Sequence, residues 1–85
     1  MKTFTYEIKD ALGLHARPAG MLCKAAASYS SAITLETPRG KADAKRIMAI
    51  MRLAAKQGTA LTVTCEGADE DQAHTAMQEF LAANL

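Results

Sequence analysis

The chain has 85 residues, of which 49% are hydrophobic and 22% charged, and its formal net charge is +1. Such a chain has room for one small domain, residues 1–85, because it buries only about 60–65% of the surface that its unfolded form exposes. The balanced charge provides no overall electrostatic field that would attract nucleic acid or a membrane. No apolar run approaches the roughly 20 residues of a transmembrane helix, and the first residues lack a signal-peptide core. We therefore expect a cytoplasmic protein without direct membrane insertion.

The first predicted elements are a strand and a helix. Apolar and polar residues alternate over residues 3–9, which is typical of a strand with one buried face. Residues 15 to about 28 then carry apolar side chains at helical spacing, namely Ala19, Leu22, Cys23 and Ala26. Pro18 is tolerated only in the first turn of a helix, so this helix must begin near His15.

A hairpin and a second helix follow. Residues 33–36 alternate as a strand, residues 37–40 have the composition of a tight turn, and residues 41–43 form a short return strand. Residues 45–56 are helical in composition, with an expected core stripe of Ile50, Leu53 and Ala54.

The last predicted elements are a strand over residues 61–66 and a helix that begins at Asp69. Gln72 stands three residues after Asp69, as in a capping box. The core stripe of this helix is Ala73, Ala76, Met77, Phe80 and Leu81. Strands with one apolar face, interleaved with helices in this order, predict an α+β fold in which one face of the sheet is wet and helices cover the other.

The isolated cysteines and the second histidine show no metal or disulfide pattern. Cys23 and Cys65 have no short spacing and lie on apolar faces, so we expect buried free thiols. His74 lies on the last helix without a visible partner, and we expect it to be an ordinary helix residue. We expect no metal site.

Charge is distributed unevenly along the chain. All ten Lys and Arg residues lie between Lys2 and Lys56, and five acidic residues but no base follow Gly58. One interpretation is an ordinary solvated face. The other is a positive surface that attracts an acidic partner.

Residues 13–18, Gly-Leu-His-Ala-Arg-Pro, are the most informative segment. His15 falls where the helix begins, and the first backbone N–H groups of a helix lack intrahelical partners and favour anions. Arg17 adds a planar donor for oxyanions. A neutral imidazole is a nucleophile near neutral pH, so this segment is suited to carrying a phosphoryl group. The alternative is more frequent in proteins: a histidine at the start of a helix is usually an exposed polar residue without a function.

Residues 13–19 resemble the active-site signature of the HPr family, the histidine-containing phosphocarriers of the phosphoenolpyruvate-dependent sugar phosphotransferase system. Similar segments of that family fall at residues 45–51, 56–58 and 66–70, so the resemblance covers the whole chain. It implies an open-faced β-sandwich, with a four-stranded antiparallel sheet and three helices on one face.

The resemblance also implies a function. His15 would accept a phosphoryl group from Enzyme I and pass it to the A domains of Enzyme II transporters. Arg17 would neutralise its charge, and the amides of Ala16 and Arg17 would bind its oxygens. No cofactor is implied, the chain would be a carrier and not an enzyme, and we expect a monomer.

The helix predicted over residues 45–56 has more apolar side chains than one core stripe needs. Ile47, Met48 and Met51 lie toward another side, so the helix is either buried all round or part of an interaction surface. We favour the surface, rimmed by Arg46 and Arg52 and extended on the first helix by Gly20, Met21 and Lys24. In the HPr family the corresponding face docks Enzyme I and the Enzyme II A domains.

Arg46 departs from the family pattern, because many HPr proteins of low-GC Gram-positive bacteria carry a regulatory serine there. This puts serine-linked catabolite control in doubt and leaves open a specialised HPr paralogue that acts as a regulatory interaction protein. A nucleic-acid-binding role for the bases of residues 39–56 is weak, because no aromatic residue lies among them.

Overall fold

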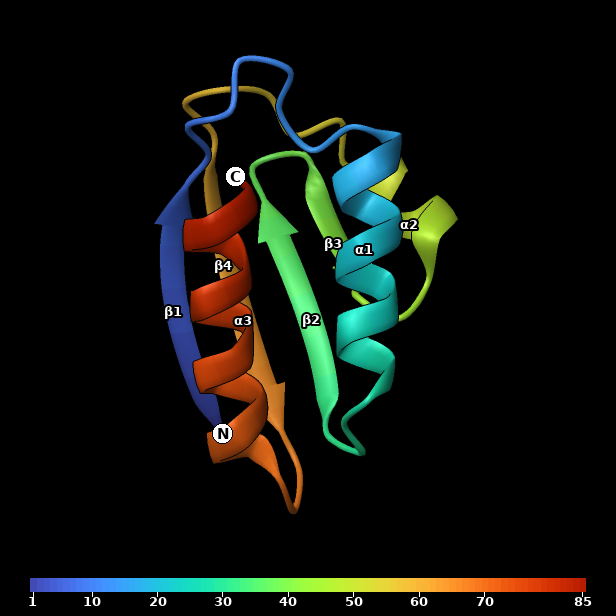
Figure 1. Cartoon of the computed structure of the whole chain (residues 1–85), viewed down its shortest axis with the longest axis vertical. Coiled ribbons are helices and arrows are strands. Elements are labelled where there is room, and N and C mark those ends of the chain that lie inside the picture. Colours follow the sequence, from blue (N-terminus) through green and yellow to red (C-terminus); the bar gives the residue numbers. More distant parts are fainter.

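The computed structural model describes residues 1–85, and the chain forms four strands and three helices (Figure 1). Their order is β1 (Lys2–Glu7), α1 (Ala16–Ala27), β2 (Ala32–Thr37), β3 (Gly40–Asp43), α2 (Ile47–Arg52), β4 (Ala60–Glu66) and α3 (Glu70–Asn84). All neighbouring strands are antiparallel, in the order β1-β4-β2-β3. The predicted order of elements is confirmed.

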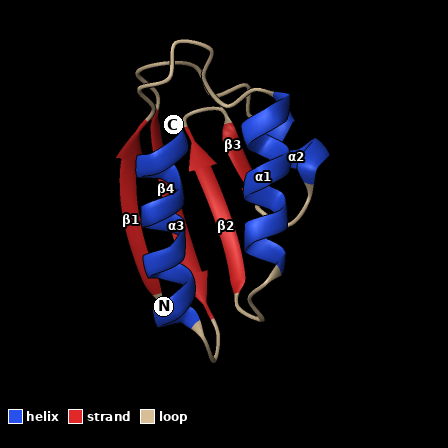
Figure 2. Cartoon of the chain, in the orientation of Figure 1, coloured by secondary structure: helices blue, strands red, loops and turns tan.

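The helices and the sheet form two layers. α1 and α3 lie side by side over one face of the sheet, and α2 lies beside α1 near β3 (Figure 2). The other face is open and carries threonine pairs, in which the hydroxyls of Thr3 and Thr64 lie 3.4 Å apart and those of Thr5 and Thr62 lie 3.3 Å apart. The fold is therefore the expected open-faced β-sandwich of the α+β class.

A core of 19 buried hydrophobic residues fills the space between the layers. Each helix contributes to it, and the fully buried residues include Ala19, Leu22 and Ala26 of α1 and Ala73, Met77 and Leu81 of α3. Ala76 and Phe80 of the predicted α3 stripe are partly buried against this core. No helix is both long and apolar enough to cross a membrane.

The two cysteines and His74 are accounted for by packing within the fold. Both cysteines are free thiols; Cys65 is fully buried, which raises the pKa of its thiol, and Cys23 is only half-buried. The expectation of burial therefore holds fully for Cys65 alone. The His74 ring packs edge-on against Phe4, with ring centroids 5.2 Å apart, which accounts for its place on α3.

α2 is shorter than the predicted helix over residues 45–56. It ends after Arg52, and Ala54 has a φ of +47°, a left-handed conformation that cannot continue a helix. This reversal turns Ala54 outward and buries Ala55 instead, so Ala54 was wrongly assigned to the core stripe. Ile50 and Leu53 are buried as expected.

The capping box predicted at Asp69 is also wrong. Asp69 precedes α3, but its side chain makes no capping bond. Its carboxylate instead accepts the backbone N–H groups of Ser30 and Ser31, both at 2.9 Å, and the hydroxyl of Ser31. These hydrogen bonds, that of the Ser31 hydroxyl first, lower the pKa of Asp69 to about 2. Asp69 therefore fixes the α1–β2 loop against the start of α3.

This contact predicts a specific loss of stability in acid. Because the pKa of Asp69 is lowered on folding from 3.8 to about 2, its stabilising effect is complete above about pH 4 and is lost as the pH falls toward 2. Asp69→Asn should flatten the fall of the urea midpoint between pH 4 and pH 2. Asp71→Asn, in the same helical turn but outside the serine loop, is the matched control and should keep the wild-type pH profile.

Candidate functional site

His15 stands immediately before α1 and is half-exposed. Its backbone is extended, with φ −88° and ψ −176°, and its side chain makes no capping bond. Its carbonyl oxygen accepts the Ala19 amide at 2.9 Å, which begins the helical hydrogen bonds. The helix therefore begins where Pro18 required it to begin, and the imidazole is left free of local hydrogen bonds.

The first turn of α1 leaves two backbone donors for a ligand. The amides of Ala16 and Arg17 have no acceptor in the helix, and none of the loop hydrogen bonds uses them. Pro18 has no N–H, and the Ala19 amide is already paired with His15. The two free donors therefore lie within two residues of the imidazole.

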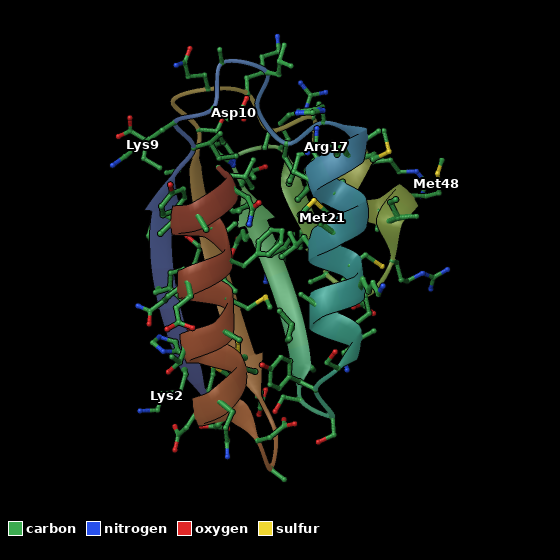
Figure 3. All side chains as sticks on the ribbon, viewed as in Figure 1. Lys2, Lys9, Asp10, Arg17, Met21 and Met48 are labelled. Carbon is green, nitrogen blue, oxygen red and sulfur yellow. The ribbon has the colours of Figure 1, made fainter.

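Charges around this turn favour an anion. The first turn of α1 contains no acidic residue, and the Arg17 side chain is exposed. The two ion pairs of the structure, Met1 with Glu70 and Lys2 with Asp71, lie at the opposite end of the molecule, where Lys2 is labelled in Figure 3. Arg17 has no carboxylate partner, so its guanidinium adds to the positive end of the helix dipole.

A depression of about 260 Å³ opens at His15 between the start of α1 and the end of α3. It is lined by Asp10, His15, Arg17, Pro18, Met21, Ala83 and Asn84. Figure 3 shows Asp10 and Arg17 at the same end of the molecule. Sequence reasoning missed Asp10, Ala83 and Asn84, since nothing in a local pattern indicates that the end of the last helix lies beside residue 15.

This arrangement is suited to holding a phosphoryl group on nitrogen. A ring nitrogen of His15 can form a bond to phosphorus, and two amides and one guanidinium are available for the oxygens. The open depression leaves room for a second protein to present or remove the group. No three His, Cys, Asp or Glu side chains are grouped so that they could hold a metal ion.

An apolar surface, which we call the α1–α2 patch, lies beside this site. It consists of Gly20, Met21, Ile47, Met48 and Met51. Met48 is 63% exposed, Met21 44%, and Ile47 and Met51 39% each. A β-carbon at Gly20 would lie 3.5 Å from the Ile47 side chain, so α1 and α2 form one continuous surface. The alternative in which α2 is buried all round is therefore wrong.

Three exposed basic side chains lie on or next to the two helices that carry the patch, and Leu12 is an exposed apolar residue outside it. Lys24, Arg46 and Arg52 are all exposed. Lys45, in contrast, donates from Nζ to the Tyr29 carbonyl oxygen at 2.7 Å and has a structural role. Leu12, for which no local pattern predicts a role, is 74% exposed in the loop before His15.

Comparisons with known proteins agree with this fold. Residues 2–83 match the family model PTS-HPr, described as the PTS HPr component phosphorylation site. The phosphocarrier protein HPr of Lysinibacillus sphaericus is 44% identical over 95% of this chain and 92% of its own length. That of Mycoplasma capricolum is 42% identical over 95% of this chain and 91% of its own length.

Solved structures give the same result. A mycoplasma histidine-containing phosphocarrier protein superimposes with a TM-score of 0.93 at 39% identity, covering 96% of this chain and 93% of that one. HPr of Thermoanaerobacter tengcongensis gives a TM-score of 0.92 at 41% identity, covering 98% and 93%. The class is thus that of small phosphocarrier proteins. The chain belongs to the HPr family of the phosphotransferase system.

The exposure of the α1–α2 patch predicts which substitutions the fold tolerates. Met48→Asp should change the free energy of unfolding by less than about 0.5 kcal/mol, because Met48 is a surface residue. Ile50→Asp is the matched control on the same helix; it places a charge in the core and should cost at least about 4 kcal/mol. Urea unfolding followed by circular dichroism measures both, and a large loss with Met48→Asp would place Met48 in the core.

Proposed function

We propose that this chain accepts a phosphoryl group on His15 from phospho-Enzyme I and donates it to the A domains of Enzyme II transporters during sugar uptake. The observation that carries the proposal is the free start of α1, where an unpaired imidazole, two unpaired amides and an exposed Arg17 come together without an acidic residue in the first turn. Membership of the HPr family supports the same role.

The transfer is a displacement at phosphorus. A ring nitrogen of His15 donates its lone pair to form the new N–P bond, and the bond from phosphorus to the donor breaks with its electron pair leaving on the donor. The amides of Ala16 and Arg17 and the Arg17 guanidinium bind the phosphoryl oxygens. In transfer to Enzyme II, a nucleophile of the A domain forms the new bond to phosphorus and the N–P bond breaks with its electron pair returning to His15, so the carrier is regenerated and needs no cofactor.

The α1–α2 patch and its basic rim supply the docking surface in this proposal. Exposed methionines adapt to more than one partner, and Lys24, Arg46 and Arg52 steer an acidic one. The partners therefore share an apolar centre with acidic groups around it. We propose that the chain acts as a monomer in the cytoplasm, although an HPr dimer of T. tengcongensis is among the similar solved structures, with a TM-score of 0.77.

The site assignment is tested with His15→Ala. The variant should stay folded, because His15 is half-exposed and makes no side-chain hydrogen bond. Incubated with Enzyme I and phosphoenolpyruvate, the wild-type chain should gain an acid-labile, base-stable adduct of ~80 Da, the mass of one phosphoryl group, formed as a phosphohistidine. The variant should gain none. His74→Ala is the matched control and should be phosphorylated at the wild-type rate.

The docking surface is tested with the Met48→Asp variant in the same assay. A charge in an apolar contact should raise the KM for the carrier by tenfold to a hundredfold, which corresponds to about 1–3 kcal/mol of lost apolar contact, while the rate at saturation stays the same. Thr5→Asp on the open face of the sheet is the control. Equal KM values for the two variants would place docking elsewhere.

Arg46 favours a second candidate role, that of a specialised HPr paralogue that acts as a regulatory interaction protein without serine-linked catabolite control. Arg46 is exposed at the start of α2, within the docking rim, and it offers no hydroxyl. A serine kinase specific for HPr should therefore place no phosphate within residues 45–51, as measured by mass spectrometry of the treated chain. Arg46→Ser supplies a hydroxyl at the same position and is the positive control, which the kinase should phosphorylate. Phosphate within residues 45–51 of the wild-type chain would contradict this role.

A further inference from the structure

The loop that leads into His15 lies directly on the segment that follows α2. The Leu14 amide donates to the Ala55 carbonyl oxygen at 2.8 Å. Gly13 lies so close to the same segment that a β-carbon built there would overlap the Ala55 carbonyl oxygen and lie 2.9 Å from the Lys56 Cα. Only glycine permits this approach, and the φ of +68° at Gly13 favours glycine for a second reason.

The same segment is joined to the α1–α2 patch. The Ala54 amide donates to the Met51 carbonyl oxygen at 3.1 Å, and the left-handed Ala54 turns the chain from the end of α2 toward Gly13. Ala55 follows at once and accepts the Leu14 amide. A short path of two hydrogen bonds and a few covalent bonds therefore connects Met51, on the patch, with Leu14, the neighbour of His15.

Other hydrogen bonds restrain the loop between β1 and His15. The Ile8 amide donates to the Thr59 carbonyl oxygen at 3.0 Å, and the Gln57 side-chain amide donates to the Lys9 carbonyl oxygen at 3.0 Å. The Leu12 amide donates to the Asp10 carboxylate at 2.8 Å within the loop. Both ends of the loop are thus held by the rest of the fold, and the last of these contacts before His15 is the one between Leu14 and Ala55.

We propose that Gly13 is a positioning residue, and that its close approach to Ala55 and Lys56, together with the Leu14–Ala55 hydrogen bond, fixes His15 relative to the α1–α2 patch. When a partner docks on Met48 and Met51, the imidazole of His15 therefore lies in a fixed position relative to that partner. Displacement of a phosphoryl group is sensitive to misplacement of the nucleophile. This inference rests on the proposed function of His15 and adds to it the part of the fold that aligns docking with transfer.

Gly13→Ala tests this role, with Gly58→Ala as the matched control. Gly58 has a similar backbone conformation, with φ +88°, but no atom lies within 4 Å of a β-carbon built there. Both variants therefore carry the strain of a left-handed alanine, and only Gly13→Ala pushes the His15 loop away from Ala55. Rates of phosphoryl transfer from phospho-Enzyme I are measured at varied carrier concentration for both variants and the wild-type chain, with thermal unfolding to check the fold.

We expect Gly13→Ala to lower the rate at saturation at least tenfold while KM stays within about threefold, because the docking patch itself is unchanged. Gly58→Ala should keep wild-type transfer. Wild-type rates for Gly13→Ala, an equal loss in both variants, or a change in KM alone would each overturn the positioning role. A wild-type chain that accepts no phosphoryl group would instead overturn the proposed function together with this inference.

A second modification covers the case in which Gly13→Ala does not fold. Replacing the Leu14 amide by an ester removes the N–H that bonds to Ala55, weakens the Gly13 carbonyl oxygen that accepts the His15 amide at 3.0 Å, and leaves every side chain in place. A loss of rate at saturation of about fivefold or more, the effect of one hydrogen bond, with KM unchanged supports the positioning role. Wild-type rates for the ester overturn it.

Discussion

The single apolar face of the sheet is the constraint on which the rest of the molecule depends. β2 and β4 place Ile33, Leu35, Leu61 and Val63 on one side, all of them buried, and their alternate residues on the other. Burial of one such side chain contributes about 1.5–3 kcal/mol, so both long helices must lie on that side. They lie antiparallel there, which brings the start of α1 beside the end of α3 (Figure 1) and creates the depression at His15.

The chemistry at His15 depends on what the start of α1 lacks. A side-chain N-cap typically stabilises a helix by 0.5–2 kcal/mol, yet α1 has none and no acidic residue in its first turn. The start of α3 also lacks a side-chain cap, but it differs in charge, because Glu70 and Asp71 lie in its first turn and Asp69 precedes it. These two helices thus differ in the charge of their first turns, and at the start of α1 no acidic side chain offsets the positive end of the helix for an external anion.

α2 owes its place to packing and not to its own helical stability. Its six residues are far below the roughly 12–15 that an isolated helix needs, so the burial of Ile50 and the following Leu53 holds it in place. With these two side chains inward, Ile47, Met48 and Met51 must lie outward. The same short length brings the end of α2 to Ala54 and Ala55, where the backbone meets Gly13. One packing solution therefore produces both the exposed patch and the support beneath the His15 loop.

The sequence by itself determined the order of the elements, the apolar side of each strand and the start of α1 at His15, because alternation and the position of Pro18 are local signals. It also indicated Met48 and Met51 as surplus apolar residues on α2. Only the tertiary structure decided where α2 ends, since the left-handed Ala54 follows from Leu53 and Ala55 both being buried, a condition that no helical pattern expresses. The partners of Asp69 and the neighbours of His15 on α3 were likewise settled by the packing of the two long helices, because Ser31 and Asn84 are brought to them across the fold and not along the chain.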